Sequence, residues 1–395
     1  MTTTDPVVIV GTARTAQGGF QGVFKDIPAA ALGSAAIGAA VARAGLRPDQ
    51  IEDVIMGCVL PAGQGQAPAR QAALGAALPL SAGCTTINKM CGSGMKAAML
   101  AHDSILAGTA AVMVAGGMES MTNAPYLLDR ARTGYRIGHG RVLDHMFLDG
   151  LEDAYEKGRL MGTYAEECAD AYGFTREAQD AWATTSLARA CKAIADGSFQ
   201  DEIVPVTVRD GKANRIVNTD EQPGKANPDK IPTLKPAFRE GGTVTAANSS
   251  SISDGAAALT LMRLSHAEKL GLRPIAAIRG HATHAQQPSL FTTAPIGAIS
   301  KLLERVGWTH DQVDLYEINE AFAVVTMAAI KDLGLPEEKV NVHGGACALG
   351  HPIGASGARI VVTLLAALQK YQLKRGIASL CIGGGEATAL AVDLF

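Results

Sequence analysis

Residues 344–359 read Gly-Gly-Ala-Cys-Ala-Leu-Gly-His-Pro-Ile-Gly-Ala-Ser-Gly-Ala-Arg, a run of small residues around one histidine and one proline. Pro352 suits the first position of a helix, because its fixed φ matches the helix and its missing N–H costs no hydrogen bond there. The glycines allow another part of the chain to approach closely. The stretch therefore predicts that a loop ends at His351 and a closely packed helix begins beside it.

The first half of the chain contains a similar stretch, Cys91-Gly92-Ser93-Gly94. From Asp53 to Cys91 there are 91 − 53 = 38 residues, and from Asp314 to His351 there are 351 − 314 = 37 residues. A strand-like run ending in glycines follows in each half. We interpret this correspondence as an internal duplication, in which two similar halves pack together.

Short apolar runs alternate with alanine-rich segments outside residues 120–248. Residues 7–10, 54–56 and 112–114 are typical of buried strands, and residues 29–44 are typical of a helix that ends at Gly45. This alternation predicts an α/β fold with a mostly parallel sheet covered on both faces.

Residues 120–248 have a different composition, because they hold 35 of the 73 charged residues in 129 of the 395 positions. Thr175 and the residues after it indicate a capped helix that continues to Ala195. We expect a surface insertion that covers or lines the site, and a solvated face without a ligand is the alternative.

Composition excludes several classes of protein. The chain has 395 residues, enough for two to three domains, and its charge is 35 − 38 = −3, which argues against nucleic acid or an acidic membrane as partner. The start lacks the pattern of a signal peptide, and seven cysteines without a C-x-x-C pair indicate free thiols and no metal site. We expect a cytoplasmic protein.

Three motifs contain residues that could carry chemistry. Cys91 lies where a loop enters a helix, so the helix dipole should lower its pKa and favour a nucleophilic thiolate; a buried cysteine at a packed turn is the alternative. His351 could accept a proton from a thiol or donate to an oxyanion, or be a structural histidine. Cys381 precedes Gly383-Gly384-Gly385, whose N–H groups suit an oxyanion unless they only form a turn.

Asn319 and Glu320 follow the strand-like run of residues 315–318. An amide at this position could serve the site, although a helix N-cap is its ordinary role.

Four motifs in order, Cys91-Gly92-Ser93-Gly94, Asn319-Glu320-Ala321-Phe322, Gly350-His351-Pro352 and Cys381-Ile382-Gly383-Gly384-Gly385, make the whole chain resemble the thiolases. This family comprises acetyl-CoA acetyltransferases and 3-ketoacyl-CoA thiolases. The resemblance implies a duplicated five-layered α-β-α-β-α fold. Its first half would be residues 1–119 plus 249–271, its second half 272–395, and residues 120–248 a loop domain over the coenzyme A site.

The resemblance also implies a role for each matched residue. Cys91 would take the acyl group as a thioester after activation by His351, and Cys381 would exchange a proton with the α-carbon. Asn319, through a water, would form one oxyanion hole with His351. The main-chain N–H groups of Cys91 and Gly383 would form the other.

Coenzyme A contacts are implied less directly. The matching positions are Leu151, Met161, Phe238, Ser250, Ala321 and Phe322. The adenine-side arginine and serine of many relatives do not align. Lys225, Lys230 or Lys235 could bind the phosphates instead, and a charged face open to solvent is the default interpretation of these lysines.

The chain departs from the family pattern at three places. Leu160-Met161-Gly162 lacks the histidine of short-chain biosynthetic members, and loss of that imidazole could relax the acyl pocket. Phe291 stands beside the same pocket and could shorten it. Glu386 follows the glycine run, and we expect it to point to solvent.

The sequence thus predicts a thiolase that condenses two acetyl-CoA molecules to acetoacetyl-CoA, or cleaves 3-ketoacyl-CoA, through an acyl-Cys91 intermediate. It needs no metal or redox cofactor, its substrates are coenzyme A thioesters, and we expect a homodimer or homotetramer. A degradative thiolase for longer chains and a non-catalytic thiolase-like partner subunit are the alternatives.

Overall fold

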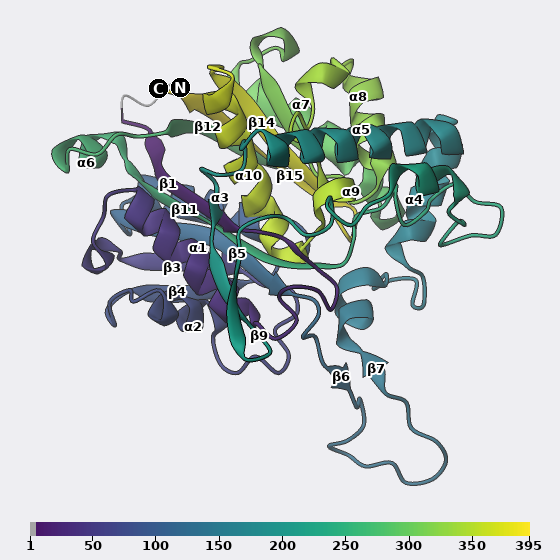
Figure 1. Cartoon of the computed structure of the whole chain (residues 1–395). Helices are drawn as coiled ribbons and strands as arrows, with labels where there is room; N and C mark the ends of the chain where they lie inside the picture. The colour runs from purple at the N-terminus through teal and green to yellow at the C-terminus, as the bar shows by residue number, and fades with distance from the viewer. Residues whose placement is uncertain (1–4) are drawn as a thin grey trace.

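The computed structural model describes residues 5–395, and its centre is one mixed sheet of eleven strands (Figure 1). The strand order is β13-β14-β15-β12-β1-β11-β5-β3-β4, with β2 paired to β11 and β8 paired to β1. The strands are β1 (Val7–Thr15), β2 (Gly18–Gly19), β3 (Asp53–Gly57), β4 (Gly83–Ile87), β5 (Val112–Ser120), β8 (Ile203–Val204), β11 (Ser253–Arg263), β12 (Ala276–Ala285), β13 (Leu315–Ile318), β14 (Arg375–Ile382) and β15 (Glu386–Leu394).

The prediction of a mostly parallel sheet is wrong. Strand β3 runs parallel to β4 and β5, and β13 runs parallel to β14. The pairs β5–β11, β11–β1, β14–β15 and β15–β12 are antiparallel. Only Gly383–Gly385 separate β14 from β15, and a connection that short can join only antiparallel neighbours.

The two halves repeat one topology, which supports the predicted duplication. The order β3, β5, β11, β1 in the first half corresponds to β13, β14, β15, β12 in the second, with the same directions. Both β1 and β12 also change register just before a glycine, at Gly11 and Gly280. A Cβ atom on Gly11 would lie 2.1 Å from the backbone oxygen of Ala40, so this bulge lets the covering helix approach.

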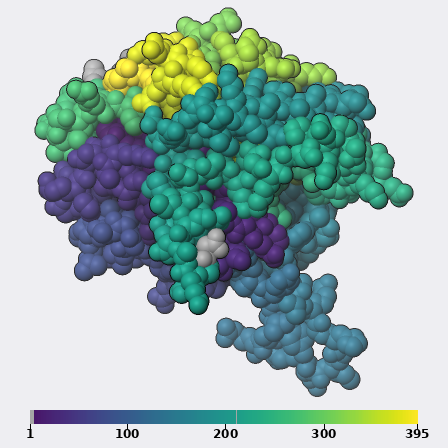
Figure 2. Space-filling model, in the orientation of Figure 1, coloured from purple at the N-terminus to yellow at the C-terminus, as the bar shows by residue number. Residues whose placement is uncertain are grey.

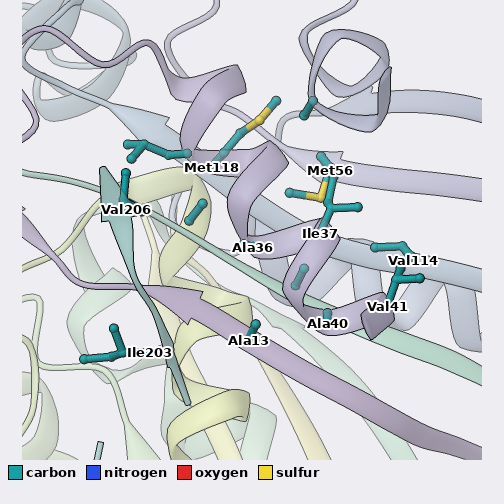
Figure 3. Packing of buried hydrophobic residues seen from close by; sticks show 14 of the residues in the cluster. Ala13, Ala36, Ile37, Ala40, Val41, Met56, Val114, Met118, Ile203 and Val206 are labelled. Atoms are coloured by element: carbon teal, nitrogen blue, oxygen red, sulfur yellow. The ribbon is translucent and has the colours of Figure 1, made fainter. Parts of the chain in front are cut away.

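The helices form three layers around the two halves of the sheet. Helices α1 (Ala29–Arg43) and α2 (Pro68–Gly75) cover the outer face of the first half, and α7 (Ala294–Val306) and α8 (Ala323–Leu333) cover that of the second. Between them lie α3 (Ser93–Ala107) and α10 (Ile353–Lys370). Each interface between a helix layer and the sheet has its own apolar core. Figure 3 shows part of the core beneath α1, where Ile37 and Val41 of that helix lie near Met56 and Val114 of the sheet.

Helix α10 is long and apolar enough to cross a membrane by length and composition, but 83% of it is buried inside the fold. It is therefore a core helix of the central layer. Its burial requires the small residues of the 344–359 stretch: a Cβ atom on Gly357 would lie 2.4 Å from the backbone nitrogen of Met95 in α3.

Residues 121–248 lie outside the main sheet except at β8. A loop between β6 (Tyr126–Leu127) and β7 (Leu143–Asp144) projects from the body (Figures 1 and 2). The segment continues through α4 (Met161–Tyr172), then α5 (Arg176–Ala195), which Thr175 caps as predicted, and then the hairpin of β9 (Val206–Asp210) and β10 (Ala213–Val217). The remaining short α-helices of the described residues are α6 (Leu264–Lys269) and α9 (Ala346–Leu349).

Candidate active site

One narrow pocket contains both candidate cysteines and the candidate histidine. Both halves and the 120–248 segment contribute to its wall, so the three groups meet although Cys91 and Cys381 are 290 residues apart in sequence (381 − 91). The lining residues are Met90, Cys91, Gly150, Leu151, Met161, Ser250, Phe291, Ala321, Phe322, His351, Ile353, Cys381 and Gly383.

A strained loop presents Cys91 to this pocket. Met90 has φ = +46°, a left-handed conformation that is costly for a residue with a side chain. Ser93 holds the loop, because its Oγ accepts from the N–H of Lys89 at 2.9 Å and donates to the backbone oxygen of Met90 at 2.6 Å. Gly92 lets this loop pack closely, since a Cβ atom there would lie 2.4 Å from the end of the side chain of Ile382, beside Cys381, which would then have to move.

The expected low pKa of Cys91 is wrong. Helix α3 does begin two residues later, at Ser93, but burial raises the pKa of the thiol to about 11. The N–H groups of Gly383 and of Cys91 itself hydrogen-bond the sulfur and oppose this shift without outweighing it. Removal of the thiolate from water therefore dominates over the helix dipole, and the nucleophile needs a base.

His351 is the candidate base, because its ring is neutral and its Nε2 has no partner within residues 5–395. It precedes α10, with Pro352 as the N-cap and Ile353 as the first helical residue, one position later than predicted. Its Nδ1 lies 2.6 Å from Ser356 Oγ, and its buried Nε2 has no partner within residues 5–395. Burial, followed by the charge of Arg359, lowers the pKa of the imidazole to about 3, so the ring is neutral at physiological pH.

Cys381 lies at the end of β14 and is 1% exposed. Burial, followed by the nearby Cys91, raises the pKa of its thiol well above the ordinary value. The N–H group of Gly383 hydrogen-bonds the sulfur of Cys91, and burial raises the pKa of both thiols, so both are protonated at physiological pH. A protonated thiol beside a nucleophile can donate or recover a proton.

Asn319 and Phe238 lie behind the wall of the pocket instead of lining it. The N-cap role of Asn319 is wrong, because α8 begins at Ala323 with Phe322 as its cap. Its Oδ1 accepts from Nη2 of Arg359 at 3.3 Å, and its buried Nδ2 has no partner within the described residues, so this amide could hold a water. The Phe238 ring packs edge-to-face on Phe322, with their centroids 6.0 Å apart.

The other nine predicted site residues line the pocket. Those nine are Cys91, His351, Cys381, Gly383, Leu151, Met161, Ser250, Ala321 and Phe322. Sequence reasoning missed the positioning residues Ser356 and Arg359, which both lie in the quoted 344–359 stretch. A hydroxyl five residues after the histidine was the available signal for Ser356.

Glu386 does not extend freely into solvent as expected. Its carboxylate forms an ion pair with Nζ of Lys89, and the two side chains are only 34% and 22% exposed. Lys89 precedes Cys91 by two residues, and Glu386 follows the glycine run after Cys381. The pair therefore joins the loops that carry the two thiols.

Glu320, the neighbour of Asn319, has a structural role behind the pocket. Its carboxylate accepts from Trp182 Nε1 at 3.1 Å, from Ser186 Oγ at 2.8 Å and from Asn341 Nδ2 at 2.9 Å. With these partners the carboxylate is fully buried and is not available to a substrate.

Two thiols and a neutral imidazole, with backbone N–H groups aimed at one sulfur, define a cysteine-dependent acyltransferase on an α/β scaffold. Comparison with known families narrows this class. The model described as "Thiolase, N-terminal domain" matches residues 7–265, and "Thiolase, C-terminal domain" matches residues 272–394. The chain belongs to the thiolase family.

Individual relatives agree over their full length. The chain is 52% identical to "Acetyl-CoA acetyltransferase 2" of Arabidopsis thaliana, covering 98% of this chain and 97% of that protein. It is 48% identical to "Acetyl-CoA acetyltransferase" of Syntrophomonas wolfei, covering 99% of each. The crystal structure of the Bacillus anthracis acetyl-CoA acetyltransferase matches with a TM-score of 0.96 at 41% identity over 99% of each chain, which confirms the predicted fold class.

Proposed function

We propose that this thiolase condenses two molecules of acetyl-CoA to acetoacetyl-CoA and catalyses the reverse cleavage. The observation that carries the proposal is the meeting of Cys91, His351 and Cys381 in one pocket of a chain whose full-length relatives are named acetyl-CoA acetyltransferases. The protein is an acyltransferase, and its substrates are coenzyme A thioesters.

The first half of the reaction transfers the acetyl group to the protein. His351 Nε2 accepts the thiol proton as Cys91 Sγ attacks the thioester carbonyl, and the N–H groups of Cys91 and Gly383 stabilise the oxyanion. The carbon–sulfur bond of acetyl-CoA then breaks, and the departing coenzyme A thiolate takes the proton of the Cys381 thiol, which leaves Cys381 as a thiolate and His351 protonated. A base is required because burial keeps the Cys91 thiol protonated.

The second half forms the carbon–carbon bond. The Cys381 thiolate left by the first half takes a proton from the methyl group of a second acetyl-CoA, and protonated His351, together with a water held by Asn319 Nδ2, stabilises the enolate oxygen. The enolate carbon attacks the acetyl-Cys91 thioester, the carbon–sulfur bond to Cys91 breaks to release acetoacetyl-CoA, and the Cys91 thiolate recovers its proton from His351. Each step moves an acyl group or a proton and changes no oxidation state, so the route as proposed calls for no redox cofactor.

A second pocket is suited to bind the nucleotide end of coenzyme A. It is lined by Lys225 and Lys230, and it shares the 246–251 segment with the catalytic pocket, since Ser251 lines the former and Ser250 the latter. Lys235, the third candidate, does not line it. We assign the phosphates to this pocket and the reactive thioester to the catalytic one.

We also propose a cytoplasmic homodimer, with the homotetramer as the larger alternative. Strand β4 lies at one end of the sheet, its residues are exposed or half-buried, and it leads directly to the Cys91 loop. Its outer edge is free to pair with a second copy within the part of the chain described. A mass measurement in solution distinguishes the two states, and the substitution Thr85→Pro should weaken the dimer.

Trapping the intermediate tests the catalytic proposal. Incubation with labelled acetyl-CoA should acetylate Cys91 in the wild type and in Cys381→Ser, but not in Cys91→Ser, as shown by peptide mass spectrometry. Cys381→Ser should nevertheless fail to make acetoacetyl-CoA. An unlabelled wild-type protein would favour the non-catalytic partner subunit, and faster turnover of longer ketoacyl chains than of acetoacetyl-CoA would favour the degradative enzyme.

A further inference from the structure

Two histidines and one aspartate meet outside the catalytic pocket, at the contact between the halves. His102 and Asp103 belong to α3, and His281 belongs to β12. His102 Nδ1 lies 3.0 Å from Asp103 Oδ1, and His281 Nε2 lies 2.9 Å from the same oxygen. Within residues 5–395, this is the one group of three His, Cys, Asp or Glu side chains whose ligand atoms all lie within 4.8 Å of one another.

The chemistry of these atoms matches a zinc-type ion. Imidazole nitrogens and a carboxylate oxygen are common ligands of zinc and of neighbouring divalent metals. Metal–ligand bonds of about 2.0–2.1 Å in tetrahedral geometry place the ligand atoms roughly 3.3 Å apart. The distances from Asp103 Oδ1 to the two imidazole nitrogens, 3.0 Å and 2.9 Å, are within about 0.4 Å of that value, so rotation of the side chains could admit an ion.

Burial holds the two imidazole rings in place, while the exposed carboxylate leaves the cluster accessible to an ion from solvent. The side chains of His102 and His281 are 11% and 13% exposed, whereas Asp103 is 53% exposed. The rings meet edge-to-face with centroids 5.1 Å apart. Arg263 is the nearby cation that opposes metal binding, and its guanidinium donates to the backbone oxygens of Asp5 and Leu106.

We propose that His102, Asp103 and His281 form a divalent metal site of the zinc type that clamps α3 to β12. His102 lies nine residues after Ser93 (102 − 93), or about 14 Å along the helix. The ion would therefore stabilise the contact between the halves and would not touch substrate. The sequence did not reveal this site, because His281 is 178 residues from Asp103.

Cobalt titration of the full-length, chelator-treated protein tests the site. The wild type should bind one Co²⁺ per chain with visible d–d absorption, and Zn²⁺ should displace it and raise the Tm by at least about 2 °C. Asp103→Asn keeps an oxygen that both imidazoles can hydrogen-bond but removes the charged ligand, so metal affinity should fall at least about tenfold with the metal-free Tm retained. His281→Ala should lose binding too.

His266→Ala is the matched control, because it removes a histidine outside the cluster and should leave the titration unchanged. The proposal is overturned if the wild type binds no Co²⁺, or if Asp103→Asn binds it as tightly as the wild type. It is equally overturned by an intense near-ultraviolet thiolate-to-cobalt band, which would place the ion at a cysteine. None of these readouts depends on the proposed reaction.

Discussion

Ser356 Oγ lies 2.6 Å from His351 Nδ1 and 3.0 Å from the backbone oxygen of Pro352. Because that backbone oxygen can only accept, the hydroxyl donates to it and accepts the Nδ1–H of the imidazole. This arrangement places the lone pair on Nε2, the nitrogen without a partner in the described structure. One hydroxyl thus selects the tautomer that can take a proton from Cys91.

Replacement of Ser356 by alanine should reduce kcat about tenfold, equivalent to about 1.4 kcal/mol, because the imidazole loses its fixed tautomer and orientation. The KM for acetyl-CoA should change little. Ser300→Ala is the matched control, since Ser300 makes the same bond to the backbone oxygen four residues earlier, at 2.8 Å, without an imidazole. Equal losses of kcat in both variants would contradict the role of Ser356.

The Lys89–Glu386 ion pair should position the two thiol loops relative to each other. Lys89→Met and Glu386→Gln should each lower kcat several-fold, and the pair exchange Lys89→Glu with Glu386→Lys should recover part of it. Lys370 and Asp196 form a similarly exposed pair away from the pocket, so Lys370→Met is a suitable control. Additive effects of Lys89→Met and Glu386→Gln in a double-mutant cycle would argue against coupling.

Local sequence patterns brought out residues that the structure places in one pocket, because each lies at a junction of elements with a recognisable composition, such as the helix start after Cys91. They failed where the outcome depends on distant residues. The pKa of Cys91 depends on how completely the other half buries it, and the environment of Glu386 depends on Lys89, 297 positions away. The direction of β15 follows from the three-residue connection Gly383–Gly385, which can join only antiparallel neighbours. The local sequence pattern does not show that β14 and β15 are neighbours in the sheet.

Phe291 should limit the length of the acyl chain. It is 3% exposed, lines the catalytic pocket and packs edge-to-face on Tyr164 with centroids 6.2 Å apart. Phe291→Leu should raise kcat/KM for 3-ketohexanoyl-CoA relative to acetoacetyl-CoA by about tenfold or more, because two methylenes gain space. Leu290→Ala removes an exposed neighbour and should leave the ratio unchanged. An unaltered ratio in Phe291→Leu would place the limit elsewhere.

His343 should make the fold sensitive to acid. Burial lowers the pKa of this imidazole to about 4, and neither ring nitrogen has a hydrogen-bond partner within residues 5–395. The unfolded chain takes up the proton near the ordinary pKa of about 6.5, whereas the folded chain takes it up only near pH 4. The stabilisation by the neutral buried ring is therefore present above about pH 6.5 and is lost as the pH falls toward 4. Between pH 7.5 and pH 5 the free energy of unfolding should fall by about 2 kcal/mol.

His343→Phe keeps an aromatic ring against Phe199 and Tyr371 but cannot bind a proton. Its free energy of unfolding, measured with urea, should therefore fall less between pH 7.5 and pH 5 than that of the wild type. If both proteins lost the same amount, another group would have to account for the acid sensitivity.

Lys230 should bind a phosphate of coenzyme A. It lines the second pocket, whereas its neighbour there, Lys225, is already paired with Glu221, and no ion-pair partner of Lys230 is found in the described part of the chain. Lys230→Ala should raise the KM for acetyl-CoA about five- to tenfold, more at low salt than at high salt, with kcat nearly unchanged. Lys235→Ala, outside the pocket, should alter neither constant. Acetyl-pantetheine lacks the nucleotide phosphates, so Lys230→Ala should turn it over as the wild type does; a comparable rise in its KM would mean that Lys230 shapes the pocket without contacting a phosphate.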